Sequence, residues 1–286
     1  TQHVYDRHPT TMPAALAFEE VPDMTCDLTG IELETLLDTS TTGLPTYEKL
    51  ATITDSSIGG EYHRTFYYDY KGREIQRVEC DFEGNILRTT SRYDLIGNLL
   101  AQRESYTHGG KTDVLDRTFE YDSRSRMTEE TAQFNDGEQA VVAYAYDELG
   151  QLIGKTYGTG QHAIHETMDY NMQGWLTEKS SELFDMKLRY YDPEPYYDGD
   201  AYYAGNISEW WWQHKNVNGN YDADNNTYIF HYDDLSRLND SRLTYNESED
   251  IADEFVERNI TYDKNSNIIT LNRSSQSPDD MKNYRF

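Results

Sequence analysis

The segment from Gly150 to Thr156 carries the residue types of a phosphate-binding loop, two glycines followed by a lysine and a threonine. That motif needs four residues between its glycines, whereas three separate Gly150 from Gly154. It also needs a helix to begin after the second glycine, and the residues here are predicted to continue as a strand. The spacing therefore argues against phosphate binding.

Histidine and cysteine lack the spacing of a metal site or of a catalytic nucleophile. His162 and His165 are three residues apart, which on a strand directs their side chains to opposite faces. Cys26 and Cys80 allow one disulfide at most, and neither belongs to a Cys-x-x-Cys pair. The chain also lacks a Gly-x-Ser-x-Gly elbow. We expect no metal, no cofactor and no catalytic residue, and whether the cysteines pair stays open.

Carboxylates are too numerous for their proximity to be informative. The 286 residues include 52 Asp and Glu against 25 Lys and Arg, giving a net charge of -27. Chance pairs of carboxylates are therefore expected and do not favour glycoside hydrolysis. The cluster from Asp222 to Asn226 lacks the glycine and the distal glutamate of a calcium loop, so a polar turn is the expected reading. The charge excludes binding to nucleic acid backbones as the main role.

An aromatic cluster at Trp210, Trp211 and Trp212, near Tyr202 and Tyr203, is the remaining candidate site. On a strand, Trp210 and Trp212 would share one face and Trp211 would lie on the other. One interpretation is a plug that packs against the wall of the fold. The other is a platform that stacks on a sugar ring or a partner peptide. Both stay open at this point.

A recurring unit positions these residues. It reads aromatic, Asp, two variable residues, Gly or Ser, a polar residue and an aliphatic residue, and an Asp followed by a residue with positive φ predicts a tight reversal. Alternating runs such as Tyr62 to Tyr68 precede the turns, so each unit is predicted to be a β-hairpin. Clear copies begin at Tyr68, Tyr93, Tyr121, Tyr146, Tyr170, Tyr232 and Tyr262, with degenerate copies at Cys80 and Tyr203.

Hairpins in this number predict an all-β antiparallel strip of about 16 to 18 strands. Open sheets rarely exceed about 10 strands without curling, so we expect the strip to curl into part of a hollow wall. Apolar residues make up only 36% of the chain, which disfavours a dry two-layer sandwich.

The units YDYKGREI at Tyr68, YDLIGNLL at Tyr93 and YDELGQLI at Tyr146 resemble the repeats of the RHS or YD-repeat family. The resemblance runs from about Tyr62 to Arg273, and the YAGNIS segment before the tryptophans is similar to RHS proteins of gut-type Bacteroidetes. It implies hairpins joined edge to edge in a hollow cocoon, as in the C component of insecticidal Tc toxins and in teneurins. The implied role is encapsulation or display of a C-terminal toxin. No self-cleaving core precedes Phe286, so we expect a fragment without core or toxin.

Residues 1 to 55 lack a clear copy of the unit and are predicted to cap the strip, with strands at 31 to 37 and 47 to 53. We assign 56 to 286 to the strip, with an irregular insertion at about 185 to 228. No apolar stretch is long enough to span a membrane. The sequence thus predicts a non-enzymatic shell or display scaffold, secreted or in the cell envelope. The alternative is an envelope module that binds carbohydrate or protein through the Trp210 to Trp212 cluster.

Overall fold

The computed structural model describes residues 2–9, 12–19, 37–38, 41–54, 57–216, 218–221, 225–245, 255–274 and 282–285. The chain forms two compact units, one made of residues 1–144 and 157–159 and the other of residues 145–156 and 160–286.

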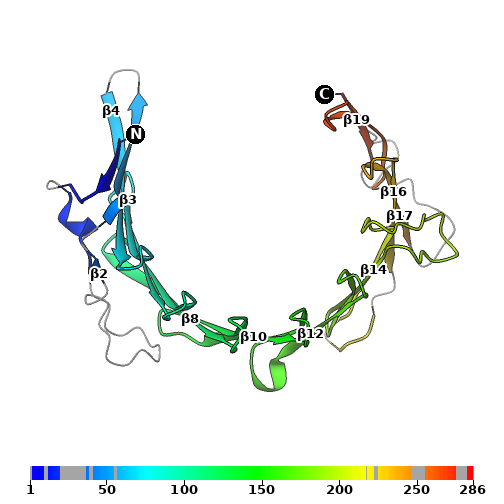
Figure 1. Cartoon of the computed structure of the whole chain (residues 1–286), viewed down its shortest axis with the longest axis horizontal. Coiled ribbons are helices and arrows are strands. Elements are labelled where there is room, and N and C mark those ends of the chain that lie inside the picture. The colour runs from blue at the N-terminus through cyan, green and yellow to red at the C-terminus, as the bar shows by residue number, and fades with distance from the viewer. Residues whose placement is uncertain are drawn as a thin grey trace. The chain divides into compact units, whose positions relative to one another are not determined.

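The first unit is a series of antiparallel strands in chain order, seen side by side from blue to green in Figure 1. Neighbours pair from β3 through to β10, and β1 and β2 add to β3 and β4. The elements are β1 (Gln2–Asp6), the 3-10 turn η1 (Ala14–Leu16), β2 (Leu37–Asp38), β3 (Thr41–Thr54), β4 (Ser57–Asp69), β5 (Glu74–Cys80), β6 (Ile86–Tyr93), β7 (Leu99–His108), β8 (Lys111–Tyr121), β9 (Met127–Phe134) and β10 (Gln139–Tyr146).

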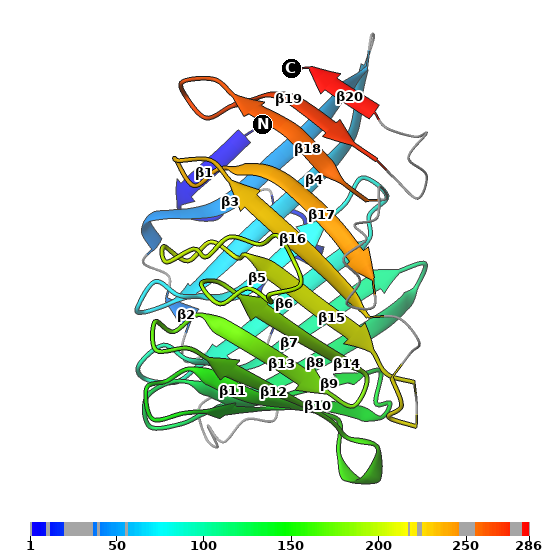
Figure 2. The same cartoon turned by 90° about the vertical axis from the view of Figure 1, so that its right-hand side faces the viewer.

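The second unit repeats this pattern, and its strands follow one another in Figure 2. Each strand from β12 to β19 pairs antiparallel with the next along the chain. The elements are β11 (Leu152–Tyr157), the 3-10 turn η2 (Gly160–His162), β12 (Ile164–Tyr170), β13 (Leu176–Ser181), β14 (Phe184–Arg189), β15 (Glu209–His214), β16 (Asn226–Tyr232), β17 (Leu238–Tyr245), β18 (Glu257–Tyr262), β19 (Ile268–Arg273) and β20 (Lys282–Arg285). The predicted all-β strip of antiparallel hairpins is confirmed in each unit.

The hairpin turns share one hydrogen-bonding scheme. In the turn at Asp94, the carboxylate Oδ1 accepts hydrogen bonds from the backbone N–H groups of Ile96, Gly97 and Asn98 at 2.9, 2.7 and 2.8 Å. The other oxygen, Oδ2, accepts one from Nδ2 of Asn98 at 2.8 Å. The fourth residue after the aspartate therefore clamps its carboxylate. The same side-chain contact is made in other turns by Arg73, Asn85, Arg126, Arg237 and Asn267.

Serine fills the glycine position in three of these turns without changing them. Ser125, Ser236 and Ser266 have φ of 60°, 60° and 66°, in the left-handed region that Gly97 occupies with φ of 111°. Each serine N–H donates to the carbonyl of its turn aspartate at 2.8 to 3.1 Å, as do the N–H groups of Gly72, Gly84 and Gly150, whereas the Gly97 N–H donates to the Asp94 carboxylate. The aspartate and the side chain that binds its carboxylate therefore determine the turn. Serine is less stable than glycine in the left-handed conformation that the turn requires.

The repeat tyrosines join successive hairpins. The Tyr121 hydroxyl donates to the carbonyl of Leu99, at the start of the second strand of the preceding hairpin, at 2.9 Å. Hydroxyl to carbonyl bonds of 2.6 to 3.2 Å to the preceding hairpin are also made by Tyr68, Tyr93, Tyr170, Tyr232 and Tyr262. This tyrosine therefore holds one unit to the next.

A small hydrophobic core lies where η1 covers the sheet of the first unit. Leu16, Tyr47, Tyr67, Ile75 and Val78 are all buried there. The Leu16 carbonyl accepts hydrogen bonds from the hydroxyls of Thr65 and Tyr67 at 3.0 and 2.8 Å. Pairing of residues 47–53 with the strand from Tyr62 is confirmed, because Leu50 lies opposite Tyr62. Residues 31–36 and Cys26 lie outside the described residues, and the domain boundary at 55 stays a prediction.

Candidate functional site

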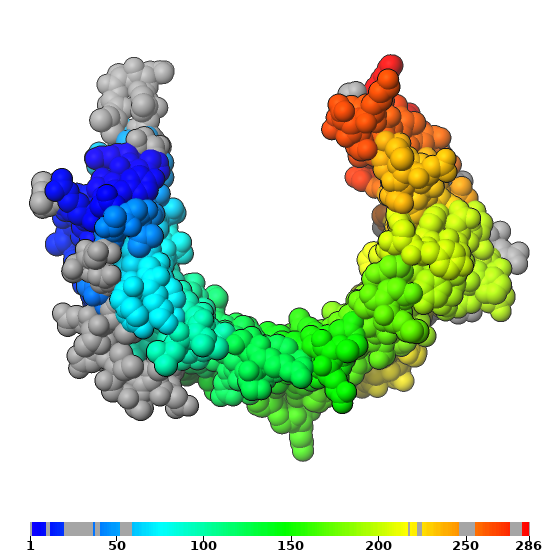
Figure 3. Space-filling view, viewed as in Figure 1, coloured from blue at the N-terminus to red at the C-terminus, as the bar shows by residue number. Residues whose placement is uncertain are grey.

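The hairpin of β14 and β15 departs from the repeat, because residues 190–208 replace its tight turn. Tyr190 takes the place of the repeat tyrosine, since its hydroxyl donates to the carbonyl of Leu176 at 2.8 Å. The hairpin closes where the Ser208 N–H donates to the Arg189 carbonyl at 2.8 Å. Tyr203 therefore lies inside a long loop and not at the start of a tight turn. The yellow-green atoms of this part of the chain appear in Figure 3.

The three tryptophans lie on both faces of β15. Trp211 is opposite Lys187 of β14 and Thr227 of β16, whereas Trp212 is opposite Met186. The alternation expected of a strand is therefore observed. The predicted insertion at 185 to 228 contains β15 and most of β14, so regular strands carry this cluster.

Trp210 and Trp212 form an aromatic row on one face with residues of β16. Their ring centroids are 4.6 Å apart, and Trp212 stacks on Tyr228 at 5.7 Å. Phe230 extends the row with a centroid 5.8 Å from that of Tyr228. A cavity of about 380 Å³ borders Trp210. In the described residues the buried Trp210 Nε1 has no hydrogen-bond partner.

Tyr202 and Tyr203 occupy different surroundings. The Tyr202 ring packs edge-on against Tyr232 at 4.9 Å, and its hydroxyl accepts a hydrogen bond from the Tyr232 N–H at 3.2 Å. Tyr203 is 77% exposed and stacks on Tyr191 at 5.8 Å. The five residues singled out from sequence thus lie in several places, and whether they bind a ligand stays a prediction.

Trp211 is the member of the cluster that faces a walled cavity. The cavity has a volume of about 310 Å³ and lies between the sheet and the 190–208 loop. Its floor is formed by Lys187, Trp211 and Thr227, one from each of three adjacent strands, and its walls include Tyr196 and Tyr197. This space, the Trp211 pocket, is within the size range of small-molecule sites.

The loop over the Trp211 pocket is anchored to the sheet by polar contacts. The Glu194 N–H lies 3.1 and 3.0 Å from the two carboxylate oxygens of Glu209. The Asp198 carbonyl is 3.0 Å from Nε2 of His231, and its carboxylate pairs with Arg242 at 3.1 Å. A Cβ at Gly199 would lie 2.9 Å from Oε1 of Glu209, so a larger residue there would displace this carboxylate. These contacts hold the pocket wall close to β15.

Glu209 is a buried carboxyl at the base of this pocket. Its exposed fraction is 1%. Burial raises its pKa from 4.5 to about 7, although the Glu194 N–H and the Arg189 guanidinium oppose this change, while Glu194 and Asp192 add to it. Arg189 also forms an ion pair with Glu194. A carboxyl with this pKa exists in both protonation states near neutrality.

Lys187 supplies a positive charge next to the indole. Its Nζ lies 5.8 Å from the centroid of the Trp211 ring, in cation–π range. Within the described residues Lys187 forms no ion pair, whereas Arg189 forms ion pairs with both Glu194 and Glu209. Glu178 lies opposite Lys187 on β13 but does not approach to ion-pair distance.

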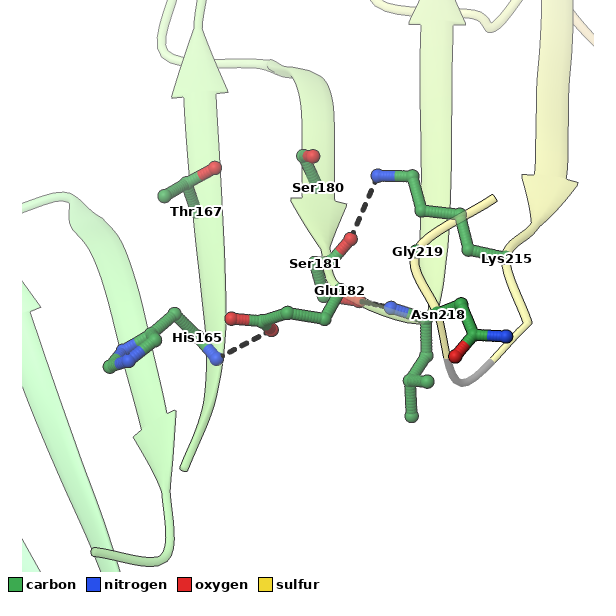
Figure 4. A pocket seen from close by; sticks show the side chains of 9 residues that line it. His165, Thr167, Ser180, Ser181, Glu182, Lys215, Asn218 and Gly219 are labelled. Atoms are coloured by element: carbon green, nitrogen blue, oxygen red, sulfur yellow. Dashed lines mark hydrogen bonds between the residues drawn. The ribbon is translucent and has the colours of Figure 1, made fainter. Parts of the chain in front are cut away.

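A second cavity of about 560 Å³ lies beside the C-terminal end of strand β13, and Figure 4 shows the residues that line it. Lys215 reaches across it, donating to the Ser181 carbonyl at 2.9 Å and pairing with Asp185 at 2.7 Å. Glu182 accepts a hydrogen bond from the His165 N–H at 2.7 Å. The Lys215 ammonium and the Glu182 carboxylate each already have a partner within the chain, so the cavity offers a ligand few free groups.

The chemical motifs dismissed from sequence have structural roles. Gly150 ends a repeat turn, and its segment continues as β11 and not as a helix. His162 ends η2 and His165 lies on β12. In the described part of the chain no three His, Cys, Asp or Glu side chains gather as metal ligands. Asp222 and Asp224 lie outside that part. No helix within it has the length and apolar composition of a membrane span.

Sequence reasoning missed the polar half of the Trp211 pocket. Lys187 reaches the indole only through the strand register, which places it opposite Trp211. Glu209 lies two residues before Trp211 on β15, so strand alternation alone puts both on one face. The signal in the sequence was the alternation of charged and apolar residues in 184–189 beside the tryptophans. A second missed element is a turn at Asn216, whose Oδ1 accepts hydrogen bonds from the N–H groups of Asn218 and Asn220 at 2.9 and 3.3 Å.

Comparison with known proteins gives a likeness of fold only. No protein-family model matches the chain, and no curated protein matches it significantly. The solved structure of TcdB2–TccC3 with Cdc42 is 12% identical, with a TM-score of 0.54 over 86% of this chain and 15% of that chain. TcdB2–TccC3 without its hypervariable C-terminal region is 16% identical, with a TM-score of 0.56 over 84% and 12%.

A porin-like protein from Bacteroides uniformis is 10% identical, covering 84% of this chain and 94% of that chain. Its TM-score of 0.34 is too low to support an argument. The chain spans 12 to 15% of the length of the toxin-complex chains. The protein therefore shares a fold with part of those chains.

Proposed function

We propose that the chain is a structural strip of the RHS or YD-repeat kind, and that it acts as a shell or display scaffold without catalytic activity. The observation that carries this proposal is the use of the repeat side chains. The turn carboxylates accept hydrogen bonds from their own turns, as Asp94 does, and the repeat tyrosines bind the preceding hairpin, as Tyr121 does. Polar groups committed to architecture are not available for chemistry.

The likeness to TcdB2–TccC3 chains supports a role as a curled wall around or beside another polypeptide. We propose that this partner is a C-terminal toxin or effector region of the same polypeptide, as in bacterial RHS toxins. A net charge of -27 favours solubility, because like-charged copies repel one another. Exposed strand edges would otherwise invite pairing between copies. We propose a secreted or cell-envelope location, as the resemblance to RHS proteins implies.

Cross-linking mass spectrometry on the natively produced polypeptide tests the scaffold. We expect cross-links from the strip to a second polypeptide segment, in the same chain or in another, and protection of that segment from protease. Unfolding the strip in denaturant should remove this protection. Cross-links confined to the strip, with no protected segment, would refute the proposal.

A second candidate function is an envelope module that binds carbohydrate or protein through the tryptophan cluster. The observation that favours it is the anchored loop over Trp211, because a repeat turn would have closed this hairpin without building a cavity. A ligand titration that leaves the tryptophan emission and the heat of mixing unchanged across a glycan panel would exclude the carbohydrate form of this role.

A further inference from the structure

The chemical class of the ligand follows from the aromatic, hydroxyl and charged groups that line the Trp211 pocket. Resting on the second proposed function, we propose that this pocket binds an acidic sugar, a uronic acid residue whose ring stacks on Trp211 and whose carboxylate pairs with Lys187. The strip can serve as a scaffold whether or not this site binds sugar.

The indole supplies the surface for a sugar ring. Trp211 faces the cavity from β15, and Tyr196, which is 61% exposed, lies at its rim. A pyranose has an apolar C–H face that packs on aromatic rings, and its hydroxyl groups need polar partners at the edge. The Tyr197 hydroxyl, 3.4 Å from that of the buried Thr227, provides such a group beside Trp211.

The charges of the pocket favour an acid over a neutral or basic ligand. Arg189 is balanced by Glu194 and Glu209, with both of which it forms ion pairs. Lys187 has no ion-pair partner in the described residues, and its ammonium lies over the indole at 5.8 Å. A basic ligand would meet this ammonium, whereas a carboxylate would pair with it. A neutral sugar has no charged group to pair with the Lys187 ammonium.

The net charge of the chain does not prevent this contact. The value of -27 is spread over the whole chain. At physiological ionic strength, charges more than about 8 Å from the pocket are largely screened. The groups next to the ligand therefore decide its sign, and there Lys187 is the unbalanced one.

Isothermal titration calorimetry near neutral pH, with digalacturonate as an acidic and maltose as a neutral α-1,4-linked disaccharide, tests the proposal. We expect digalacturonate to bind at least tenfold more tightly than maltose, and its affinity to fall as NaCl is raised. Lys187→Met keeps the side-chain stem and should lower digalacturonate affinity about tenfold or more while leaving maltose unchanged. Trp211→Leu should weaken binding of both sugars.

Lys264→Met is the matched control, because Lys264 is an exposed lysine of the same unit in the turn before β19. It should bind digalacturonate as the wild type does. Circular dichroism of each variant shows whether the strands are retained. Equal affinity for the two disaccharides, no effect of Lys187→Met in a folded protein, or no binding at all would overturn the proposal. None of these results would touch the scaffold, which the cross-linking experiment tests separately.

Discussion

Replacing Glu209 with glutamine should change how the stability of the second unit depends on pH. The Glu209 carboxyl is 1% exposed, and its pKa in the folded chain is about 7 against 4.5 for a free glutamate. The difference, at 1.36 kcal/mol per pKa unit, is worth about 3 kcal/mol. This is an upper bound, because water that enters the pocket would reduce the cost of burial.

The sign follows from proton uptake. Between pH 4.5 and about 7 the folded chain holds the Glu209 proton more tightly than the unfolded chain does. The stability of the wild type should therefore fall as the pH rises through this window. Glu209→Gln cannot ionise, and its amide oxygen can still accept the hydrogen bond from the Glu194 N–H. The variant should match the wild type near about pH 4 and exceed it by up to about 3 kcal/mol at about pH 8.

Tryptophan fluorescence during urea unfolding is the assay. The four tryptophans of the chain, Trp175 and Trp210 to Trp212, lie on or beside the strands around Glu209, so their emission reports this region. Glu148→Gln, an exposed position in the same unit, is the control and should follow the wild type at every pH. Parallel stability curves for the wild type and Glu209→Gln from about pH 5 to 8 would show that this carboxyl is not held in a raised-pKa state.

The repeat aspartates give a separate pH effect of opposite sign. The Arg237 and Asn267 side chains, together with backbone N–H groups, lower the pKa of Asp233 and Asp263 below 3.8. Their contribution to stability is present above pH 3.8 and is lost as the pH falls through the lowered values. Because the two windows do not overlap, the Glu209 effect can be measured without interference from the turns.

Three further predictions concern the repeat itself. Tyr121→Phe removes the hydrogen bond to the Leu99 carbonyl and should cost about 0.5 to 1.5 kcal/mol in chemical denaturation, whereas Tyr106→Phe on the same sheet should cost less. Asp94→Ala leaves three turn N–H groups without their acceptor and should cost about 1 to 3 kcal/mol, with Asp94→Asn losing less. Ser236→Gly relieves a φ of 60° and should raise stability by up to about 1 kcal/mol, and a loss would refute the strain argument.

The hairpins could be predicted from sequence because their determinants are local. An aspartate and a glycine three residues later fix a turn through contacts within five residues, as in the Asp94 turn. The alternating runs that flank the turns then fix the strands. The degenerate copy at Cys80 is a complete turn for the same reason, since the Asp81 Oδ1 accepts hydrogen bonds from the N–H groups of Glu83 and Asn85 at 2.9 and 2.8 Å.

The candidate site could be predicted only in part, because its partners are distant in sequence. Alternation on a strand places Trp211 apart from Trp210 and Trp212 without further information. The position of Lys187 beside Trp211 depends on the register across a loop of residues 190–208, which the sequence does not specify. The raised pKa of Glu209 likewise depends on burial under that loop. Long-range register and burial are therefore the parts that local patterns leave undetermined.

The serines of the turns show how the repeat tolerates variation. Ser125 and Ser266 occupy the left-handed position, and their hydroxyls lie 3.3 and 3.4 Å from the clamp side chains of the preceding turns, Asn98 and Arg237. The Oγ of Ser125 and Ser266 therefore adds a bond between turns that glycine cannot make, and this bond offsets the cost of positive φ. At Ser236 the backbone carbonyl accepts a hydrogen bond from Nδ2 of Asn206 at 3.3 Å. A glycine at this position would keep that bond. At Ser125 and Ser266, serine thus stabilises the junction with the preceding turn, whereas glycine at the same position of the unit favours the turn itself.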